Sequence, residues 1–294
     1  MSLSLPKISI VTPSFNQAAF LGDAMDSVLH QDYPALEYVL MDGGSTDGSV
    51  DLIRERQERL ASWTSGPDGG HYTALNTGFA QTSGEVMGWL NSDDKYLPWT
   101  LSVVGEIFAQ FPEVEWLTTL FPLRWDARGR AVRCSQRSGY SREAFMAGEH
   151  LPAGHWRYEG WVQQESTFWR RSLWDRAGGA LDTRWKLAAD FELWARFHRH
   201  AKLYAVDTPL GGFRLHGDQK TSLQKALYHE EAEAILQLYG GAIPGRLAAL
   251  GRSLALHCPK ALHGVCGALG LRYPAALCLR ERGDAGWALS SALH

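Results

Sequence analysis

The sequence has few cysteines, no long hydrophobic run and no signal-peptide pattern. Four cysteines occur in 294 residues, and none has the spacing of a metal-binding pair: Cys134, Cys258, Cys266 and Cys278. Reduced thiols in a cytoplasmic protein are the simplest interpretation. No apolar run reaches the length of about 18 residues that a membrane-spanning helix needs, so we expect none. Lys7 leads directly into the first predicted strand without a leader pattern, which also favours a cytoplasmic location.

A large positive charge is absent, as are two common nucleotide-binding motifs. The net charge of −3 argues against nucleic acid as a partner. The sequence contains neither Gly-x-x-x-x-Gly-Lys-Ser/Thr nor Gly-x-Gly-x-x-Gly, which disfavours P-loop and dinucleotide-binding proteins. Twelve tryptophans are many for this length. Their rings can stack on sugars and bases, but we expect most of them to fill the core.

The most informative stretch is an apolar run that ends in two adjacent carboxylates. Residues 86–90 are apolar, and Asp93 and Asp94 follow shortly after. A buried strand that ends in this way delivers acidic side chains to its C-terminal edge, where open α/β sheets bind ligands. Adjacent buried carboxylates repel each other, and a divalent cation such as Mg²⁺ or Mn²⁺, which also carries substrate phosphates, usually offsets this cost. A solvated turn is the alternative.

Strand and helix patterns alternate along most of the chain. Apolar runs predict strands at residues 8–11, 38–41, 85–90, 114–121, 166–169 and 203–206. Helical spacing predicts helices at residues 18–31, 50–60, 72–81, 99–110 and 187–198, and again after residue 221. Repeated βα units predict an α/β fold with a mainly parallel sheet flanked by helices on both faces. Residues 124–158 are polar, Gly-rich and irregular, and we expect a long loop or a small excursion there; loops of this length inside a domain are usually functional or mobile.

The composition changes at Gly240 and Gly241. Residues 241–294 carry a net charge of +4 and the remainder −7. This tail is rich in Leu and Ala, and its pattern predicts short amphipathic helices broken by three prolines: Pro244, Pro259 and Pro274. Basic amphipathic helices bind anionic membrane surfaces. The alternative is that the helices pack on the acidic remainder of the chain or against a second subunit.

Four polar loops follow successive predicted strands, at residues 12–16, 42–48, 66–70 and 91–94. In a parallel sheet such loops face one crevice. In the second loop, glycines let the backbone approach a ligand closely, and Asp42 can accept hydrogen bonds from base N–H groups or ribose hydroxyls. A turn that ends with Ser49 as a helix N-cap is the alternative, and both roles can hold together.

These loops resemble those of one enzyme family. The matching segments read IVTPSFN at 10–16, SVLHQDYP at 27–34, DGGSTDG at 42–48 and WLNSDD at 89–94. In this order and spacing they resemble the family 2 glycosyltransferases, which share the GT-A fold, over roughly residues 6–225. The resemblance implies a GT-A catalytic domain at 1–225, with a nucleotide-sugar-binding half at 1–100 and an acceptor-side half at 101–225. A helical C-terminal extension would occupy 226–294.

The resemblance also implies roles for the loop residues. Thr12, Pro13 and Phe15 would line the base pocket, with Phe15 stacked on the base. Further contacts to the nucleotide would come from the other loop positions: Asn16, Asp42, Gly43, Asp68, Asn91 and Asp93. Asp93 and Asp94 fall on the acidic motif that holds the metal and the nucleoside diphosphate. Asn91 replaces an acid found in many relatives, although its amide can still bond a ribose hydroxyl.

A candidate general base lies in the second half. Residues 188–194, AADFELW, resemble the family motif in which an aspartate at the start of a helix deprotonates the acceptor hydroxyl, and Asp190 falls on that aspartate. Ala189 replaces the glutamate that usually precedes it. The residues alone leave open that Asp190 is a helix N-cap. Glu192 is the alternative base.

Polar residues around two later predicted strands complete the candidate site. By the resemblance, His216 completes the metal site or contacts the diphosphate, and neutral imidazole is a good Mn²⁺ ligand. An isolated surface histidine is the alternative. Cationic side chains can neutralise a diphosphate. We expect the acceptor or diphosphate side to contain five residues: Gln164, Glu165, Glu192, Arg214 and Lys220.

Together these parts predict an inverting glycosyltransferase. It would transfer a sugar from a nucleotide-diphosphate donor to a hydroxyl of a saccharide or lipid-linked acceptor, in cell-surface polysaccharide or glycolipid biosynthesis. Mn²⁺ or Mg²⁺ would stabilise the leaving diphosphate, and one carboxylate would act as general base. A sugar-phosphate nucleotidyltransferase is disfavoured because residues 12–22 contain no Lys or Arg. A non-catalytic nucleotide- or sugar-binding module is disfavoured because four candidate acids are intact: Asp42, Asp93, Asp94 and Asp190.

Overall fold

The structure is a computed structural model that describes residues 4–137, 139–151, 160–217, 219, 224–243, 245, 277–281, 283 and 286–290. Its first part alternates strands and helices: β1 (Ile8–Ser14), α1 (Ala18–Leu29), β2 (Leu36–Asp42), α2 (Ser49–Arg56), η1 (Gln57–Arg59), β3 (Ser62–Ser65), α3 (His71–Ala80), β4 (Val86–Trp89), β5 (Lys95–Tyr96) and α4 (Thr100–Gln110). Every helix and strand predicted in this region is present, with ends shifted by a few residues.

The second part is less regular. It contains β6 (Trp116–Thr119), β7 (Leu123–Trp125), β8 (Ala131–Cys134), α5 (Arg142–Met146), η2 (Gln164–Ser166), β9 (Phe168–Arg170), α6 (Arg171–Arg176), α7 (Ala189–Phe197), β10 (Leu203–Val206), β11 (Gly211–Arg214), α9 (Lys225–Leu238), β12 (Leu277–Glu281) and β13 (Trp287–Ser290). Among the described helices, none is both long enough and apolar enough to cross a membrane.

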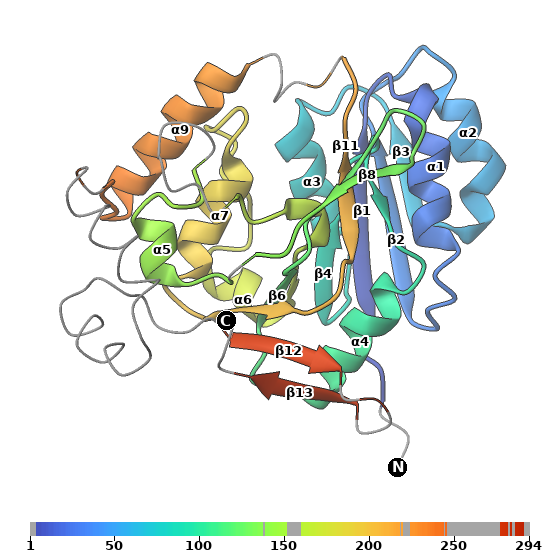
Figure 1. The fold of residues 1–294 in the computed structure, drawn as a ribbon. Helices are drawn as coiled ribbons and strands as arrows, with labels where there is room; N and C mark the ends of the chain where they lie inside the picture. The colour runs from blue at the N-terminus through green and yellow to red at the C-terminus, as the bar shows by residue number, and fades with distance from the viewer. Residues whose placement is uncertain are drawn as a thin grey trace.

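A large sheet forms the centre of the molecule. Within the described residues its strand order is β13-β12-β10-β6-β9-β4-β1-β2-β3. Neighbours from β4 to β3 are parallel, as are β6, β10 and β12, whereas β9 runs antiparallel to both β4 and β6. Figure 1 shows α1 and α2 on one side of β1–β4 and α3 and α7 on the other. The predicted mainly parallel sheet flanked by helices is therefore confirmed.

Alternation along the strands divides the core between the two faces of this sheet. In β1, Ile10 packs with α1 and α4 on one face, while Val11 packs with α3 on the other. The face that carries α3 and α7 is rich in tryptophan: Trp89, Trp116, Trp169 and Trp194 are almost completely buried. The expectation that tryptophans fill the core holds for these four side chains. Each fully buried aromatic side chain contributes on the order of 2–3 kcal/mol by the area that it removes from water.

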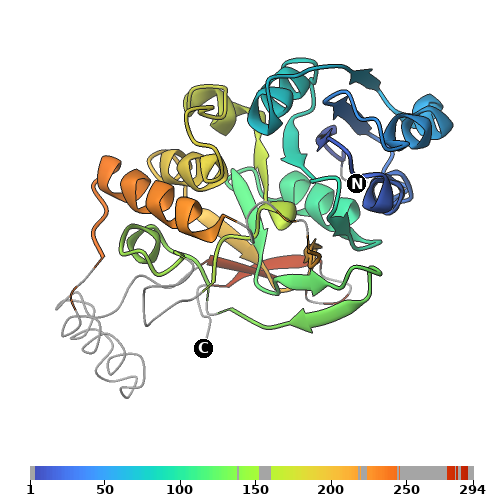
Figure 2. The ribbon, with the colours of Figure 1, turned by 90° about the horizontal axis from the view of Figure 1, so that it is seen from above.

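Two strands of a second, smaller sheet lie where the sequence pattern indicated a long loop or a small excursion. Its strand order is β5-β11-β7-β8, and Figure 2 shows the green β7–β8 hairpin at the periphery of the molecule. The segment 124–158 therefore contains parts of β7, all of β8 and α5, although residues 138 and 152–159 lie outside the described residues. β7 pairs in parallel with β11, which is distant in the chain, and short strands paired at such range leave little local pattern.

The region after residue 221 contains the predicted helix as α9, but β12 and β13 are strands where helices were predicted. α9 packs on α7, and Tyr228, Ala232 and Ile235 belong to the core. β12 pairs in parallel with β10 and antiparallel with β13, so it extends the main sheet. The indole N–H of Trp287 donates to Glu106 in α4. β12 and β13 therefore belong to the main sheet, where helices were predicted, and residues 246–276 and 291–294 are outside the described residues.

Candidate active site

A cavity of about 530 Å³ opens at the C-terminal ends of β1–β4. Its walls also include the segment before η2, the start of α7 and the end of β11. Nine of the predicted site residues line it: Pro13, Phe15, Gly43, Asp68, Asn91, Asp93, Gln164, Glu165 and Asp190. Because the carboxyl ends of parallel strands share one edge, loops far apart in sequence converge on this cavity.

One end of the cavity is built by the loops after β1, β2 and β3. Phe15 is 56% exposed, so its ring is available for stacking. Gly43 lies between this ring and Asp68: a Cβ atom on Gly43 would come within 3.2 Å of Phe15 Cδ2 and 3.1 Å of Asp68 Oδ2. Asp68 accepts a hydrogen bond from the backbone N–H of Gly70 at 2.8 Å. This narrow end combines an open aromatic face with a carboxylate, which suits a nucleoside.

Three predicted nucleotide contacts support these loops and do not line the cavity. The hydroxyl of Thr12 accepts a hydrogen bond from Tyr38 at 2.9 Å beneath β1. Asn16 accepts from the backbone of residue 46 at 2.9 Å and thereby joins the loops after β1 and β2. Asp42 is buried and accepts hydrogen bonds from the hydroxyls of Ser45 and Ser65 and from two backbone N–H groups. The side chains of Thr12, Asn16 and Asp42 therefore stabilise the loops at this end of the cavity through internal hydrogen bonds.

The acidic turn after β4 places its two carboxylates in different surroundings. Asp93 lines the cavity, and its Oδ2 lies 2.9 Å from Nε2 of His216. Asp94 points into the protein, where Oδ1 accepts from the backbone N–H of Arg214 at 2.8 Å. Burial, together with the nearby acids Asp93 and Glu165, raises the pKa of Asp94 well above its usual range. The turn therefore offers one carboxylate to a ligand and buries the other.

Arg214 has a different environment from the one expected. Its side chain is only 3% exposed and forms an ion pair with Asp23. Its Nε donates to the backbone carbonyl of Asp93, and its guanidinium carbon lies 5.2 Å from the ring centroid of Phe20. Arg214 thus stabilises the acidic turn through contacts with Asp93 and Asp23, and it does not line the cavity. The other predicted cation, Lys220, lies outside the described residues.

Asp93 and His216 fit part of a divalent-cation site. Magnesium and manganese are commonly held by one or two protein ligands, with substrate phosphates and water completing the coordination. In the part of the chain that the structure describes, no three side chains of the His, Cys, Asp and Glu types form a closed metal-ligand set. One carboxylate and one imidazole beside a cavity would leave coordination positions for phosphates and water. Asp94 bonds the backbone of Arg214 instead.

Asp190 lies at the other end of the cavity, in the first turn of α7. Its Oδ1 is shielded from solvent and has no hydrogen-bond partner within the described residues. Burial raises the pKa of Asp190 to about 6, and the backbone N–H groups at the start of α7 oppose this rise. A carboxylate with an open acceptor atom and a pKa near neutrality has the properties of a general base.

The N-cap alternative for Asp190 does not hold, because Ala188 occupies the N-cap position. The backbone N–H groups that precede α7 are instead bonded by Glu231 of α9. Its carboxylate accepts from Lys186 at 2.8 Å, from Leu187 at 2.9 Å and from Ala188 at 3.0 Å. With this cap supplied by another helix, the Asp190 side chain is left for the cavity.

Aromatic packing fixes the position of Asp190 relative to the acidic turn. Asp190 and Trp194 are four residues apart and therefore lie on one side of α7. The indole of Trp194 stacks on that of Trp89, with ring centroids 6.1 Å apart and an interplanar angle of 10°. Trp89 ends β4 and leads into the turn that carries Asp93. This contact ties the candidate base to the strand that carries the candidate metal ligand.

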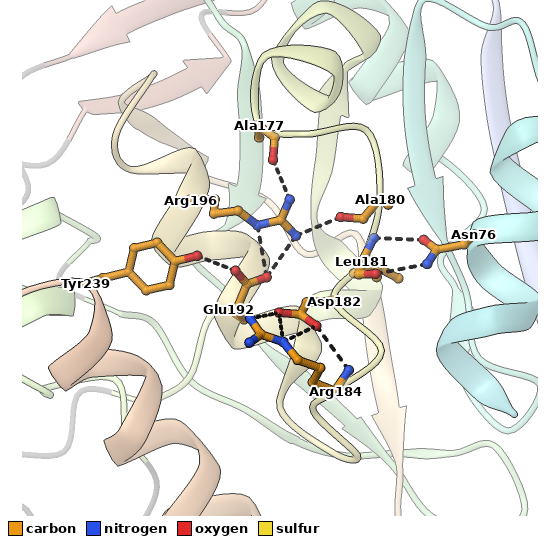
Figure 3. Close-up of polar contacts among 9 residues, drawn as sticks. All are labelled: Asn76, Ala177, Ala180, Leu181, Asp182, Arg184, Glu192, Arg196 and Tyr239. Carbon is orange, nitrogen blue, oxygen red and sulfur yellow. Dashed lines mark hydrogen bonds and ion pairs between the residues drawn. The ribbon is translucent and has the colours of Figure 1, made fainter.

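Glu192, the alternative base, lies in an internal network. Figure 3 shows its carboxylate between Arg196 and Tyr239. Arg196 also donates to the carbonyls of Ala177 and Ala180, and it holds Glu192 in a buried ion pair at 2.8 Å. Glu192 does not line the cavity, so its contacts are those of a structural residue.

Gln164 and Glu165 lie at the junction between the acidic turn and β9. Gln164 donates to the carbonyl of Trp89 at 2.7 Å and accepts from Asn91 at 3.3 Å. Burial is the main cause that raises the pKa of Glu165 to about 8, with a contribution from the charges of Asp93 and Asp190. The raised pKa favours the neutral form of Glu165 near pH 7 more than that of Asp190.

Several lining residues were missed in the sequence. They are His71 and Tyr72 at the start of α3, Phe213 beside Arg214 in β11, and Trp161, Lys186 and Tyr228. Lys186 directly precedes the Asp190 segment, and this proximity was the available signal. Nothing local distinguishes Trp161 or Phe213 from the other aromatic residues.

Comparison with known proteins identifies the family. Residues 9–114 match the family model described as glycosyl transferase family 2. An uncharacterized glycosyltransferase of Mycobacterium tuberculosis (strain CDC 1551 / Oshkosh) is 30% identical over 190 residues, which are 64% of this chain and 68% of that protein. The chain belongs to glycosyl transferase family 2.

Two solved structures show that this family 2 glycosyltransferase has the predicted GT-A type fold. Staphylococcus aureus TarS 1–349, in complex with UDP-GlcNAc, superimposes with a TM-score of 0.60 at 16% identity, covering 87% of this chain and 77% of that one. The mannosyltransferase PcManGT from Pyrobaculum calidifontis, in complex with GDP-Man and Mn²⁺, gives a TM-score of 0.53 at 19% identity, covering 92% and 81%.

Proposed function

We propose that this family 2 glycosyltransferase transfers a sugar from a nucleoside-diphosphate donor to a hydroxyl of a saccharide or lipid-linked acceptor, with inversion at the anomeric carbon. Cell-surface polysaccharide or glycolipid biosynthesis is the setting we propose. The observation that carries the proposal is one cavity lined by Asp93, at the turn after β4, and by Asp190, at the start of α7, with His216 of the segment after β11 in contact with Asp93. The TarS and PcManGT complexes, which hold nucleotide sugars, support a donor of this class.

The nucleotide is proposed to bind at the narrow end, with its base on Phe15 and its ribose near Asp68 and Asn91. Asp93 and His216 would hold a divalent cation beside the diphosphate. When bound, such a cation stabilises the negative charge that develops on the leaving diphosphate. The Mn²⁺ in the PcManGT complex supports this choice of metal. The bases of the two complexes differ, and we propose neither base over the other.

Asp190 is proposed as the general base. Its open Oδ1 would accept the proton of the acceptor hydroxyl while the acceptor oxygen forms a bond to the anomeric carbon and the bond from that carbon to the diphosphate breaks. A retaining two-step route would need a second ionised carboxylate as nucleophile. Asp93 is assigned here to the cation, and burial raises the pKa of Glu165 to about 8, which disfavours its ionised form near pH 7. This arrangement supports a single displacement.

A panel of nucleotide sugars tests the proposal. The full-length enzyme is incubated with each UDP- and GDP-sugar and Mn²⁺, and the released nucleoside diphosphate is measured with and without saccharide acceptors. We expect turnover with one or a few donors and none in EDTA. Metal-independent turnover would exclude the proposed cation. Absence of turnover and of nucleotide binding across the panel would overturn the donor class.

A further inference from the structure

The strand order divides the cavity into two ends. On one side of β4 lie β1, β2 and β3, whose loops supply Phe15, Gly43 and Asp68. On the other side lies β9, and the chain reaches it through Trp161 and η2. Asp93 follows β4 and lies between the two ends. With the nucleotide on the β1–β3 side, the β9 side is the end left for the acceptor.

Two aromatic side chains line this second end. The ring centroids of Trp161 and Phe213 are 6.0 Å apart, and their planes meet at 63°. Both side chains line the cavity and are partly exposed. Edge-to-face pairs are a preferred aromatic arrangement, and a pair at this angle presents two differently oriented apolar faces. We refer to Trp161 and Phe213 as the aromatic pair.

The backbone explains why Phe213 faces the cavity. Successive side chains of a strand point to opposite faces, and Arg214 points to Asp23 behind the acidic turn. Its neighbour Phe213 therefore points the other way. On the face opposite to Phe213, Gly212 leaves room for Trp125, since a Cβ atom there would lie 2.6 Å from its indole nitrogen.

The small sheet also supports the second ring. The guanidinium carbon of Arg124, in β7, lies 5.7 Å from the ring centroid of Trp161. A cation at this distance attracts the ring electrostatically and restrains it. β7, which carries Arg124, pairs with β11, which carries Phe213. The aromatic pair is thus held by the same hydrogen-bonded sheet.

We propose that the aromatic pair is an acceptor subsite that stacks on a sugar ring, so that the acceptor presents a saccharide at its reactive end. A pyranose has apolar C–H groups on its faces and hydroxyls around its rim. The second end of the cavity can contact both parts of such a ring. The aromatic pair is apolar and suits the C–H faces, while Gln164 and Asp190 are polar and suit the hydroxyls. The inference rests on the proposed function and adds the chemical class of the acceptor.

The same ring chemistry could come from the donor sugar, so the experiment separates the two sources. Saturation-transfer NMR measures binding of three probes: methyl β-glucoside, methyl N-acetyl-β-glucosaminide and methyl α-mannoside. The full-length enzyme is first saturated with Mn²⁺ and the nucleoside diphosphate that binds it, and then with the intact nucleotide sugar. An acceptor-subsite ligand stays bound in both states, whereas a ligand in the donor-sugar position is displaced by the nucleotide sugar.

Trp161→Leu and Phe213→Leu remove a ring but keep an apolar side chain, and each is expected to weaken glycoside binding about tenfold. Trp161→Phe keeps a ring and should recover most of the affinity. Trp99→Leu, at an exposed tryptophan outside the cavity lining, is the matched control and should bind like wild type. The nucleotide Kd, measured in the same samples, verifies folding and reports separately on the proposed function.

Three results would overturn the inference while leaving the proposed function intact. The first is glycoside affinity within twofold of wild type in both leucine variants. The second is displacement of the glycoside by the nucleotide sugar. The third is nucleotide binding by the wild-type enzyme without binding of any of the three glycosides. If the wild-type enzyme binds no nucleotide, this result would instead contradict the proposed function.

Discussion

Nε2 of His216 lies 2.9 Å from Oδ2 of Asp93, and this pair joins the segment after β11 to the turn after β4. The two residues are far apart in sequence, and Asp93 of this pair lines the cavity. Behind them, Arg214 donates to the carbonyl of Asp93 and its backbone N–H donates to Asp94. The end of β11 therefore determines how the acidic turn presents its one cavity-facing carboxylate.

From this pair we predict metal-dependent nucleotide binding. Asp93→Asn should reduce the affinity for UDP or GDP in Mn²⁺ to the level that wild type shows in EDTA. His216→Ala should weaken Mn²⁺-dependent binding by about 10- to 100-fold and affect Mg²⁺-dependent binding less, because imidazole is a better ligand for Mn²⁺. Calorimetry measures each Kd, with His200→Ala at an exposed histidine as control. Equal affinity with and without EDTA in wild type would refute the metal role.

The open Oδ1 of Asp190 leads to a prediction on turnover. Asp190→Asn removes the proton acceptor with little change in shape, and we expect turnover to fall at least about 10²-fold while the nucleotide Kd stays near wild type. Asp175→Asn, at an exposed aspartate of α6, is the matched control. Near-normal turnover in Asp190→Asn would transfer the base role to another group, and Glu192→Gln would then be tested.

The raised pKa of Asp190 predicts the pH dependence of the reaction. A general base must be unprotonated, and burial raises the pKa of this carboxyl group to about 6. Below that value the protonated fraction grows, so kcat/KM should fall about tenfold per pH unit, and above it kcat/KM should level off. Rates at saturating Mn²⁺ in buffers from about pH 5 to pH 8 measure this profile. A flat profile across this range would be inconsistent with Asp190 as the base.

The outcome at these residues shows what the sequence could predict. Loops after parallel strands meet at one edge by topology, so Pro13, Gly43 and Asp93 could be placed together from the order of elements alone. The direction of a side chain within a loop depends on partners elsewhere. Asp42 turned to the hydroxyls and N–H groups of its own loop and of β3, and no pattern in residues 42–48 indicated this choice.

Long-range pairing accounts for the remaining differences. Arg214 was expected at the diphosphate, but its ion pair with Asp23 depends on β11 meeting α1, which are distant in the chain. The same holds for β12, whose strand character follows from the open edge of β10. Trp161 and Phe213 are likewise distant in the chain and in contact in the structure. In each case the local structure depends on a contact between segments that are distant in the chain. Local sequence periodicity contains no information about such contacts.

The cap on α7 gives a prediction on stability. Glu231 accepts hydrogen bonds from three consecutive backbone N–H groups, and Glu231→Ala leaves them without that partner. An unsatisfied buried donor costs about 1–3 kcal/mol, so we expect the free energy of unfolding to fall by at least about 2 kcal/mol. Glu230→Ala, one residue away and exposed, should change it by less than about 0.5 kcal/mol. Urea unfolding of both variants gives the comparison, and equal midpoints would show that the cap contributes little.

The last prediction concerns the basic tail. Residues 241–294 carry a net charge of +4, and β12 and β13 within it belong to the main sheet, so truncation would damage the core. We instead propose replacing three basic residues outside the described part with glutamine: Arg246, Arg252 and Lys260. If the tail contacts anionic lipid, each charge contributes about 1 kcal/mol, and the triple variant should bind phosphatidylserine liposomes about 100-fold more weakly than wild type. Flotation measures the bound fraction, and neutral phosphatidylcholine liposomes and high salt should abolish binding. Wild-type protein that stays at the bottom with anionic liposomes at low salt would assign the tail to packing within the protein or against a second subunit.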